Sequence, residues 1–552
     1  MRNWLLSSLL GFVTLSFSSI GCAAPDQVVV NSSDLQSYSV KHIEPVLKNT
    51  NAAQFQQDVD VSAVRTDDDL LYPSLVEYLY SRLSKNKLWD DDELNAQVNL
   101  QLDLVTLAGF SPLFQARMEQ VQIAFQQGDI KRYDRLTTDT FLLYISYVAA
   151  AEKAGKAWFF TTSLTEPLTR PSATEVDLFV KAFESGEVPE YLSRFASPML
   201  NQPGFERVYI DLLSRAQLPP TIYEQYGLVR LGDRLEPQQY RLLLEKLTEA
   251  GITVEYRDDG YIDEALDFSI RQFQVQYGLD DDGIIGPNTV EWLNKTAKDK
   301  LRILALNSER SRLWPQQREN IILVNVPNFQ LEYWDEGYAR FESRVIVGRT
   351  SRQTPLLETQ MDSLILNPTW NVPWKIMVKD IIPKVKQDPT YLFSQRFDII
   401  EGWDSKVKID PTMINWRAVK AQQFPYRMRQ QAGELNALGQ YKFNTPNPQA
   451  IFLHDTPSKH LFDESLRAFS SGCIRVENAD EFAEVLLEQQ GKSLEEVATE
   501  RPNKSVAFKQ RIPVYIIYQT AWMSEGKAYF RGDIYDYDTK RDSLISGEFS
   551  KN

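Results

Sequence analysis

The sequence predicts a multidomain α+β protein with a long helical region, a small three-helix unit and a mainly β region that carries a large insert. Three observations support this prediction. The chain has 552 residues, more than one hydrophobic core usually supports. Apolar residues recur at helical spacing over residues 70–218. From Asn320 onward apolar and polar residues alternate, as in strands with one buried face.

The N-terminus is predicted to be an export signal, residues 1–23. Arg2 precedes the apolar run WLLSSLLGFVTLSF, and small residues surround Cys22, as at a cleavage site. We place the cleavage after Ala23. In the alternative, a lipoprotein signal, Cys22 would be acylated. Ser19, where such signals usually carry leucine, argues against it. We therefore expect a periplasmic protein, either free or lipid-anchored through Cys22.

Charge and composition exclude several classes of function. The formal net charge is −15 and no basic stripe is present, which argues against nucleic-acid binding. No internal run reaches the roughly 18 apolar residues of a membrane span, so no span is expected after signal removal. Only Cys473 of the two cysteines lies outside the signal, so the mature chain has no internal disulfide. A free thiol in an oxidising compartment is anomalous for a structural residue.

Residues 24–225 are predicted to be a helical scaffold. The segment PSLVEYLYSRL places Leu75, Leu79 and Leu83 on one helix face. The segments ARMEQVQIAFQQG and DTFLLYISYVAAAEKAG behave similarly, and each ends at a glycine that suits a helix C-terminus. This region carries no recognisable chemistry.

Residues 226–298 are predicted to be a separate three-helix unit. One amphipathic helix ends at Gly251, and a second buries Leu266, Ile270 and Phe273. A turn at DG follows, and then Pro287 begins a short third helix. The pattern FQ…GL…DG…G…T resembles the peptidoglycan-binding domain 1 family, which implies that the unit binds the cell wall. The acidic turn lacks the ligand spacing of an EF-hand calcium loop.

Residues 320–540 are predicted to be the mainly β domain. The segment from Asn320 to Thr350 alternates apolar and polar residues, with a hairpin turn at Glu336-Gly337. Further strand patterns lie in DSLILNPTW, AIFLHD, PVYIIYQTAWM and KAYFRGDIY. Residues 373–439 interrupt the strands. Because structureless loops of this length are uncommon, we expect this insert to be a lid over a substrate.

The candidate chemistry lies around the lone mature cysteine. Two of the three histidines, His454 and His460, lie within twenty residues of Cys473. A cysteine nucleophile needs an imidazole to take its proton and hold the thiolate as an ion pair. Buried cysteines also occur as packing residues, so spacing alone leaves both readings open. Three scattered histidines and one thiol do not form a zinc site, so no metal and no cofactor is expected.

The context of Cys473 favours catalysis. A predicted strand ends at His454, and SSGC forms a turn before a helix that starts near Asn478. Gly472 can adopt a backbone conformation that other residues resist, which leaves the sulfur exposed and nearby N–H groups free for an oxyanion. Phe452 lacks a hydroxyl, so it cannot supply an aromatic O–H to that oxyanion.

The pattern HDT…SSGCIR resembles the YkuD family of L,D-transpeptidases, together with NPTWNVPWKI and GQYKFN. The resemblance spans roughly residues 320–538. The family signature usually has histidine before the Gly-Cys pair, where this chain has Ser471. The YcbB-type branch, which places a peptidoglycan-binding module before the catalytic domain, is similar to this chain in carrying serine there. That branch is therefore the one indicated.

The resemblance implies a role for each site residue. It assigns Cys473 as the nucleophile, His454 as the proton acceptor and donor, and the Asp455 carbonyl as the group that orients the imidazole. It also implies that Gly472 and Cys473 supply oxyanion N–H groups. Three residues are candidate substrate contacts: Arg475, Ser471 and His460. Arg475 suits bidentate binding of a substrate carboxylate, but a structural salt bridge under the site is an equal alternative.

The predicted function is that of an L,D-transpeptidase, which forms 3-3 peptidoglycan cross-links through a cysteine thioester and releases D-Ala. The alternatives are an L,D-carboxypeptidase, a cysteine endopeptidase of the wall, and a non-catalytic wall-binding scaffold. In an NlpC-type endopeptidase the cysteine normally precedes its histidine, whereas here the histidine comes first. Peptidoglycan stem peptides are the expected partners, and cell-wall synthases are candidate partners.

Overall fold

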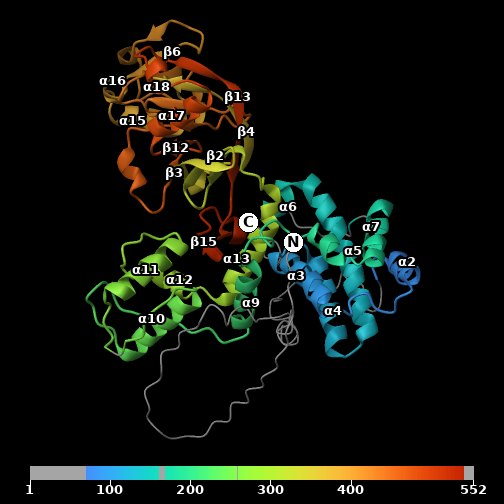
Figure 1. Cartoon of the computed structure of the whole chain (residues 1–552). Helices are drawn as coiled ribbons and strands as arrows, with labels where there is room; N and C mark the ends of the chain where they lie inside the picture. Colours follow the sequence, from blue (N-terminus) through green and yellow to red (C-terminus); the bar gives the residue numbers. More distant parts are fainter. Residues whose placement is uncertain (1–69, 161–167, 169, 258, 540–552) are drawn as a thin grey trace.

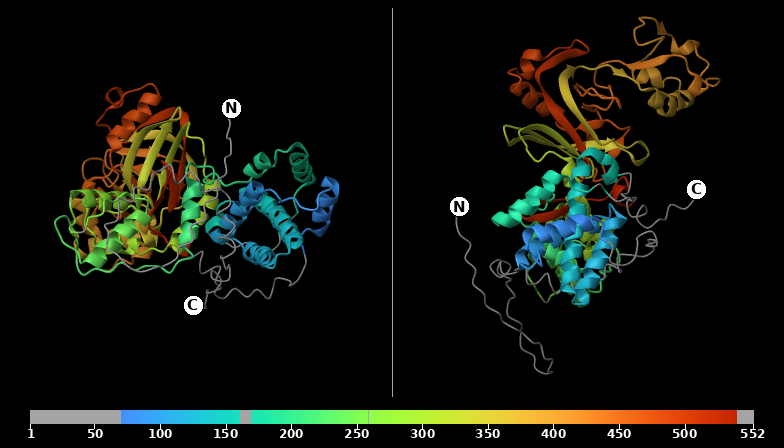
Figure 2. Two further views of the ribbon diagram at one scale, coloured as in Figure 1. Left: turned by 60° about the horizontal axis from the view of Figure 1, so that its bottom comes forward. Right: turned by 90° about the vertical axis from the view of Figure 1, so that its right-hand side faces the viewer.

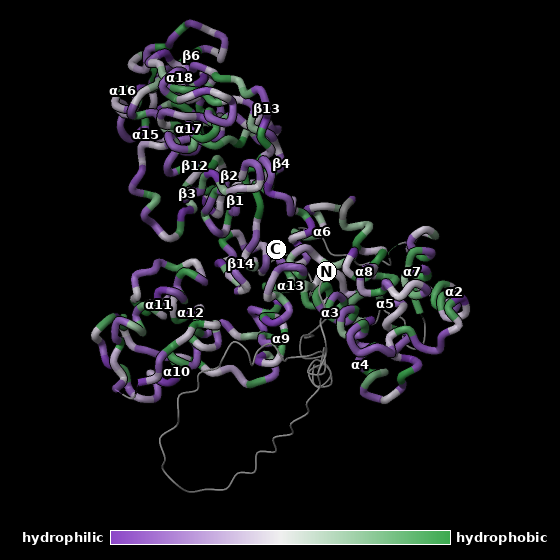
Figure 3. Tube along the Cα trace, viewed as in Figure 1, coloured by the Kyte–Doolittle hydropathy of each residue, from purple (hydrophilic) through white to green (hydrophobic). Residues whose placement is uncertain are grey.

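The computed structural model describes residues 70–160, 168, 170–257 and 259–539. A helical scaffold, a small helical module and a mainly β domain surround helix α13 (Ala297–Arg310) at the centre of the molecule (Figure 1). Hydrophobic and hydrophilic residues are mixed along each of these parts (Figure 3). Within the described ranges no helix is both long enough and apolar enough to cross a membrane. The predicted export signal and Cys22 lie outside the described residues.

The scaffold consists of helices from α2 to α9. Its boundaries follow ordinary helix signals: Asp91, Ser111 and Ser172 accept N-terminal backbone hydrogen bonds, and Gly109 and Gly186 end helices in the left-handed conformation. The helices are α2 (Pro73–Leu83), α3 (Asp92–Ala108), α4 (Pro112–Gln126), α5 (Ile130–Ala154), α6 (Lys156–Phe160), α7 (Ala173–Ser185), α8 (Val188–Ser193) and α9 (Phe205–Arg215).

The small module has the three helices that the sequence predicts, and Leu266, Ile270 and Phe273 are buried in its core. Its helices are α10 (Pro237–Glu249), α11 (Glu264–Gln276) and α12 (Pro287–Leu293). Pro287 is the first residue of α12, where its missing N–H is not needed. Helix α13 follows directly and is capped by Thr296 and Asp299, whose side chains each accept a hydrogen bond from the other's backbone N–H.

The β domain is built on a nine-stranded sheet in the order β11-β3-β12-β10-β9-β4-β13-β1-β2, and a further pairing of β2 with β3 closes it into a ring that leaves β11 outside. Helix α17 (Ala479–Gln489) packs on this sheet through Phe482, which contacts Phe341 and Phe443. The strands are β1 (Asn320–Asn325), β2 (Gln330–Asp335), β3 (Tyr338–Gly348), β4 (Leu357–Leu366), β9 (Tyr441–Asn444), β10 (Leu453–His454), β11 (Ala468–Ser470), β12 (Ile474–Val476) and β13 (Lys504–Ile517). Short helices η5 (Ser311–Leu313), η6 (Thr350–Arg352), η10 (Lys459–Phe462) and α18 (Leu494–Val497) complete the domain.

The insert after β4 is a folded subdomain with a core of its own, formed by residues such as Val378, Ile382 and Met428. It stands out from the rest of the β domain in the right-hand view of Figure 2. It has a four-stranded sheet in the order β5-β8-β6-β7. Its elements are β5 (Trp370–Asn371), α14 (Trp374–Ile376), η7 (Met377–Ile381), α15 (Ile382–Gln387), α16 (Tyr391–Ser394), β6 (Phe397–Ile400), β7 (Lys408–Ile409), η8 (Pro411–Met413), η9 (Ala421–Gln423) and β8 (Arg427–Gln430).

A C-terminal hairpin joins the β domain to the helical module. It consists of β14 (Ala521–Ser524) and β15 (Lys527–Phe530). Phe530 stacks on Tyr277 of the module, with ring centroids 5.7 Å apart, and Gln276 donates to the Ala528 carbonyl at 2.9 Å. The hairpin and the module therefore share one hydrophobic core.

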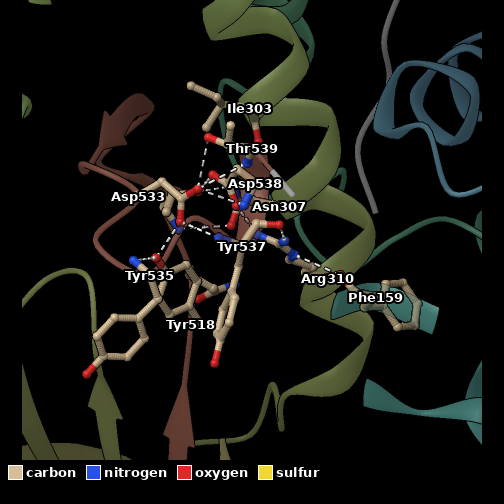
Figure 4. A network of polar contacts seen from close by, with 12 residues as sticks. Phe159, Ile303, Asn307, Arg310, Tyr518, Asp533, Tyr535, Tyr537, Asp538 and Thr539 are labelled. Atoms are coloured by element: carbon tan, nitrogen blue, oxygen red, sulfur yellow. Dashed lines mark hydrogen bonds and ion pairs between the residues drawn. The ribbon is translucent and has the colours of Figure 1, made fainter. Parts of the chain in front are cut away.

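The segment after this hairpin joins α13 to the β domain through a buried polar network (Figure 4). Arg310 is fully buried; it pairs with Asp538 and donates to the Phe159 carbonyl of the scaffold at 3.4 Å. Asp538 also accepts from Thr520 at 2.6 Å. Because a buried charge is stable only when it is paired and hydrogen-bonded, this network fixes the three parts against one another.

Candidate active site

A cavity of ≈ 1140 Å³ lies between the insert and the sheet, and both His454 and Cys473 line it. Six basic side chains line this cavity and only one acidic one does, Asp380. The basic residues are Arg349, Arg352, Lys375, Lys379, Lys384 and Arg475. In a chain with a net charge of −15, this concentration of positive charge makes the cavity suited to an anionic ligand.

His454 ends strand β10 and is buried, with 5% of its surface exposed. Its Nδ1 lies 2.5 Å from the backbone carbonyl oxygen of Asp455. Since a carbonyl only accepts hydrogen bonds, Nδ1 carries the proton in the neutral ring and Nε2 is left with a free lone pair. The contact that the resemblance assigned to the Asp455 carbonyl is therefore present, and the imidazole is in the tautomer of a general base.

The position of Asp455 is fixed through its side chain. Its carboxylate accepts from the Gln440 backbone N–H at 2.8 Å and from Lys459 at 2.5 Å. Gly439 has φ of +60°, and a Cβ there would lie 2.1 Å from the Asp455 carboxylate. The glycine of the GQYKFN segment thus allows the carboxylate to reach the backbone and hold the carbonyl that faces His454.

The turn that carries Cys473 is held by a buried threonine. Gly472 has φ of +122°, a conformation that side chains disfavour. Thr354 donates to the Gly472 carbonyl at 2.9 Å and accepts from the Gly348 N–H at 2.8 Å. Tyr535 of the C-terminal segment donates to the Gly348 carbonyl at 2.6 Å and accepts from the Thr354 N–H at 3.1 Å. The turn that carries Cys473 is therefore connected to the network of Figure 4.

The backbone N–H groups of the turn differ in availability. The Gly472 N–H donates to Ser470 Oγ at 3.0 Å, and that hydroxyl donates to the Cys473 carbonyl at 2.6 Å. Among the described residues the Cys473 N–H has no acceptor. The Cys473 N–H is thus available to donate to an oxyanion, whereas the Gly472 N–H would first have to break its hydrogen bond with Ser470.

Cys473 is half-buried, and its thiol is 3.8 Å from the Ala450 carbonyl oxygen. Burial raises the pKa of this thiol, and a hydrogen bond from the Phe452 backbone N–H and the positive charges of Lys442 and Arg475 oppose that rise. In the part of the chain that the structure describes, no group of three or more His, Cys, Asp or Glu residues could hold a metal ion.

His454 lies in a row between two cations. On neighbouring strands, Lys442 of β9 and Arg475 of β12 are its direct partners, so the three side chains share one face of the sheet. Burial lowers the pKa of His454 to about 3, and the charges of Arg475 and Lys442 add to this effect. The sequence predicts a thiolate–imidazolium pair, but burial favours a neutral thiol beside a neutral imidazole in the unliganded protein, and the two positive charges further disfavour the imidazolium.

Arg475 lines the cavity without an anionic partner. Its Nε is buried and has no hydrogen-bond partner, and no ion pair of the described residues includes its guanidinium. The positive charge of Arg349 acts on it, and Arg349 donates to the carbonyls of Ser470 and Phe469 at 3.3 and 3.2 Å. The predicted alternative of a structural salt bridge is absent here, which leaves Arg475 available to a ligand.

Ser471 connects the turn that carries Cys473 to the insert. Its hydroxyl accepts from Arg352 at 2.9 Å, and Arg352 also binds Asp380 of the insert through both of its terminal nitrogens. A bidentate arginine–carboxylate pair fixes the relative orientation of its partners. The serine before the Gly-Cys pair therefore belongs to a contact between the turn and the insert.

The structure brings together all but one of the predicted site residues. His460 is exposed on η10 and does not line the cavity, so the predicted contact of this histidine with substrate is not supported. Three contributors were missed: Lys442, Thr354 and Arg352. Lys442 lies within the quoted GQYKFN segment, where its charge next to the strand of His454 was the available signal. No sequence pattern indicates that Thr354 and Arg352 belong to the site, because only the fold brings them to it.

The comparisons with known proteins concern two regions of the chain and one relative. Residues 319–516 match the YkuD family, described as "L,D-transpeptidase catalytic domain", and residues 237–293 match a "Putative peptidoglycan binding domain". A relative from Haemophilus influenzae, called "Putative L,D-transpeptidase", is 27% identical over 86% of this chain and 80% of its own length.

Two solved structures are also similar to parts of the chain. The L,D-transpeptidase of Xylanimonas cellulosilytica is 13% identical, covers 54% of this chain and 100% of its own, and has a TM-score of 0.16. That of Stackebrandtia nassauensis is 13% identical, covers 54% and 97%, and has a TM-score of 0.21. TM-scores this low carry no weight for the fold.

Proposed function

We propose that this protein forms 3-3 cross-links in peptidoglycan through a thioester on Cys473, because residues 319–516 match the L,D-transpeptidase catalytic domain of the YkuD family and residues 237–293 match a peptidoglycan-binding domain. The observation that supports this proposal best is geometric. Cys473 and His454 line one basic cavity, and the Asp455 carbonyl holds the imidazole in the tautomer that accepts a proton at Nε2. Cysteine acyl transfer requires a thiol and a base of this kind in one site.

In the first step Cys473 Sγ attacks the carbonyl carbon of the amide bond that joins the L-centre of diaminopimelate to D-Ala. The thiol proton passes to His454 Nε2. The carbonyl oxygen becomes an oxyanion that accepts from the Cys473 N–H. When the tetrahedral intermediate collapses, the C–N bond breaks and His454 returns the proton to the leaving amine. The products are free D-Ala and a thioester on Cys473.

In the second step the side-chain amine of a diaminopimelate on another stem attacks the thioester carbonyl. His454 takes a proton from that amine, a C–N bond forms and the C–S bond breaks. The released thiolate is then protonated by His454, which restores the free enzyme. If water replaces the amine, the same steps give a tripeptide and make the protein an L,D-carboxypeptidase.

The insert serves as the lid of this site. It supplies cavity walls such as Trp374, Ile381 and Leu435, and Arg352 joins it to Ser471 of the catalytic turn. A lid that excludes water favours attack by the amine over hydrolysis. Deleting residues 373–438, which keeps Gly439 beside Asp455, should therefore raise the ratio of tripeptide to cross-linked dimer, and an unchanged ratio would rule out this role.

The remaining parts of the chain suit an enzyme of the cell wall. The three-helix module would hold peptidoglycan, and the export signal of residues 1–23 would deliver the chain to the periplasm, free or anchored through Cys22. We assign the protein to the YcbB-type branch because Ser471 precedes Gly472 and contacts the lid through Arg352. In the periplasm, cell-wall synthases would be its candidate partners.

The experiment is to incubate the mature protein with purified disaccharide-tetrapeptide and analyse the products by mass spectrometry. The proposal requires a dimer that has lost one D-Ala, and Cys473→Ala must abolish it while the variant stays folded. Hydrolysed tripeptide alone would instead identify a carboxypeptidase. The absence of any product would favour a wall-binding scaffold.

A further inference from the structure

A second cavity, of ≈ 870 Å³, lies between the helical module and the β domain, and we call it the interdomain cavity. In Figure 1 the β domain stands above the module on the same side of α13. Module residues from α11 to α12 and the first half of α13 line the cavity, together with the β1–β2 turn, the segment before β11 and the segment after β15. It shares no lining residue with the cavity of Cys473, so it is a separate candidate site.

The module contributes one face of helix α12 to this cavity. Asn288, Glu291 and Trp292 lie at i, i+3 and i+4 of the helix, and all three line the cavity. The Trp292 ring packs against Tyr277 and Phe530, with ring centroids 5.0 and 6.3 Å apart. Its Nε1–H is accessible and has no acceptor among the described residues. Trp292 therefore offers a ligand a ring of fixed position and a free hydrogen-bond donor.

The β domain contributes the facing part of the interdomain cavity. Leu466, in the segment before β11, lines the cavity and is 57% exposed, and Leu228 of the module lines it with 53% exposed. A ligand in the cavity would cover this apolar surface and gain free energy from its burial. Ser465 is exposed beside Leu466, so apolar and polar groups lie side by side there. The module alone lacks this half of the cavity.

The charge of the interdomain cavity is opposite to that of the cavity of Cys473. Six acidic and three basic side chains line it: Asp280, Asp282, Glu291, Asp299, Asp533, Asp538, Lys295, Arg302 and Arg531. Stem peptides carry several carboxylates, so an acidic cavity disfavours them. The N-acetylated sugars of a glycan strand are uncharged, and they present apolar C–H faces together with hydroxyl and acetamido groups. An aromatic ring beside amide and carboxylate side chains suits such a ligand.

The two cavities lie within the reach of one stem peptide. Leu466 lines the interdomain cavity and Ser470 lines the cavity of Cys473. Four residues of chain separate these two positions by at most about 14 Å, and a fully extended tetrapeptide is about as long. A stem attached to a sugar in the interdomain cavity is therefore long enough to approach Cys473.

We propose that the interdomain cavity binds the uncharged sugars of a glycan strand, with Trp292 as the stacking ring and Leu466 of the β domain as the facing contact. The strand would thus be held while its stem enters the basic cavity of Cys473. This inference rests on the proposed function, since it takes the sugars to belong to peptidoglycan. It requires the module and the β domain together, because each supplies one side of the site.

The test is calorimetric titration of the mature chain with tetra-N-acetylchitotetraose, an uncharged oligomer of N-acetylglucosamine. Wild type should bind it, and the free stem tetrapeptide should not displace it. Trp292→Ala and Leu466→Ser should each weaken binding about tenfold or more, because each removes apolar surface that the sugar covers. Leu231→Ser is the matched control, since Leu231 is a leucine of the module that is 50% exposed and does not line the cavity. It should bind like wild type.

The two variants separate the composite site from binding by the module alone. Trp292 also packs against Tyr277 and Phe530, so a thermal melt must show that Trp292→Ala is folded. Leu466 is exposed and lies in the other domain, so Leu466→Ser decides the question even if Trp292→Ala unfolds. The inference is overturned if wild type does not bind the oligomer, if Leu466→Ser binds it like wild type, or if the stem tetrapeptide displaces it.

Turnover connects the interdomain cavity to the reaction. The KM for D-Ala release should be compared between disaccharide-tetrapeptide and the free tetrapeptide, which lacks the sugars. Leu466→Ser should raise the ratio of the first KM to the second, and Leu231→Ser should leave that ratio unchanged. An equal ratio in Leu466→Ser and wild type would overturn the link to Cys473. If wild type releases no D-Ala from either substrate, the proposed function fails, and the titrations still decide whether the cavity binds sugars.

Discussion

Thr354 is predicted to hold the catalytic turn, and Thr354→Val tests this with little change in side-chain shape. The Thr354 side chain is fully buried and makes two hydrogen bonds, to the Gly348 N–H and to the Gly472 carbonyl. Valine cannot make either bond, so a buried donor and a buried acceptor lose their partner. Thr354→Ser keeps the hydroxyl and is the matched control.

The expected magnitude follows from the two groups left unsatisfied. Each costs about 1–3 kcal/mol when it is buried without a partner, so the domain should lose roughly 2–6 kcal/mol of unfolding free energy. At about 2–4 °C per kcal/mol for a domain of this size, that corresponds to a fall in melting temperature of about 4–24 °C. Because a freed Gly472 carbonyl lets the Cys473 N–H move away from the oxyanion, the rate of D-Ala release should fall about 10- to 100-fold.

The assays are thermal unfolding followed by circular dichroism, and D-Ala release from disaccharide-tetrapeptide well below the melting temperature. Thr354→Ser should lie close to wild type in both assays. The reasoning would be refuted if valine and serine behaved alike, because the hydroxyl would then contribute nothing. It would also fail if valine lowered the melting temperature but left D-Ala release intact, since the turn would then not depend on Thr354.

Three further predictions follow from the geometry. Asp380→Asn weakens the ion pair of Arg352 with the lid and should raise the ratio of tripeptide to cross-linked dimer. Asp388→Asn, elsewhere on the insert, should leave that ratio unchanged. The same ratio in both variants would contradict this prediction. Phe530→Ala removes a buried ring stacked on Tyr277 and should cost about 3–5 kcal/mol, seen as faster hydrogen exchange in β14, β15 and α11. Since burial lowers the pKa of His454 from 6.5 to about 3, the unfolded chain binds a proton that the folded chain does not, so stability should fall as the pH drops from about 6.5 toward 3. In thermal melts, His454→Gln should show a weaker decrease of melting temperature with falling pH than wild type. The same decrease in both proteins would contradict this prediction.

Local patterns predicted the elements of the fold well. Helix α2 begins and ends as the leucine spacing and Pro73 indicate, and the hairpin between β2 and β3 turns at Glu336-Gly337. Both patterns depend on neighbours in sequence. The closure of the sheet by β2 and β3 and the docking of the C-terminal hairpin on the module depend on distant residues, and no periodicity reports them.

The site shows the same division between near and distant residues. The residues around His454 and Cys473 form a short sequence motif that could be recognised without the fold; in the structure His454 ends β10 and Cys473 directly precedes its partner strand β12. Thr354 could not, because its contact with the Gly472 carbonyl spans 118 residues of sequence. Lys442 was within a quoted motif, yet only the strand register places it beside His454.

The charge of the cavity shows why overall composition did not predict the ligand. The chain carries a net charge of −15, and from that value alone an anionic ligand would be disfavoured. The cavity nevertheless collects basic side chains from three segments, 349–352, 375–384 and residue 475, with Asp380 as the only acid among its lining residues. The field inside a cleft depends on the charges that line it, because low-dielectric walls screen them less than bulk water does. An acidic surface around a basic cavity would repel carboxylate-rich stems everywhere except at Cys473, so added salt should weaken donor binding in the cavity.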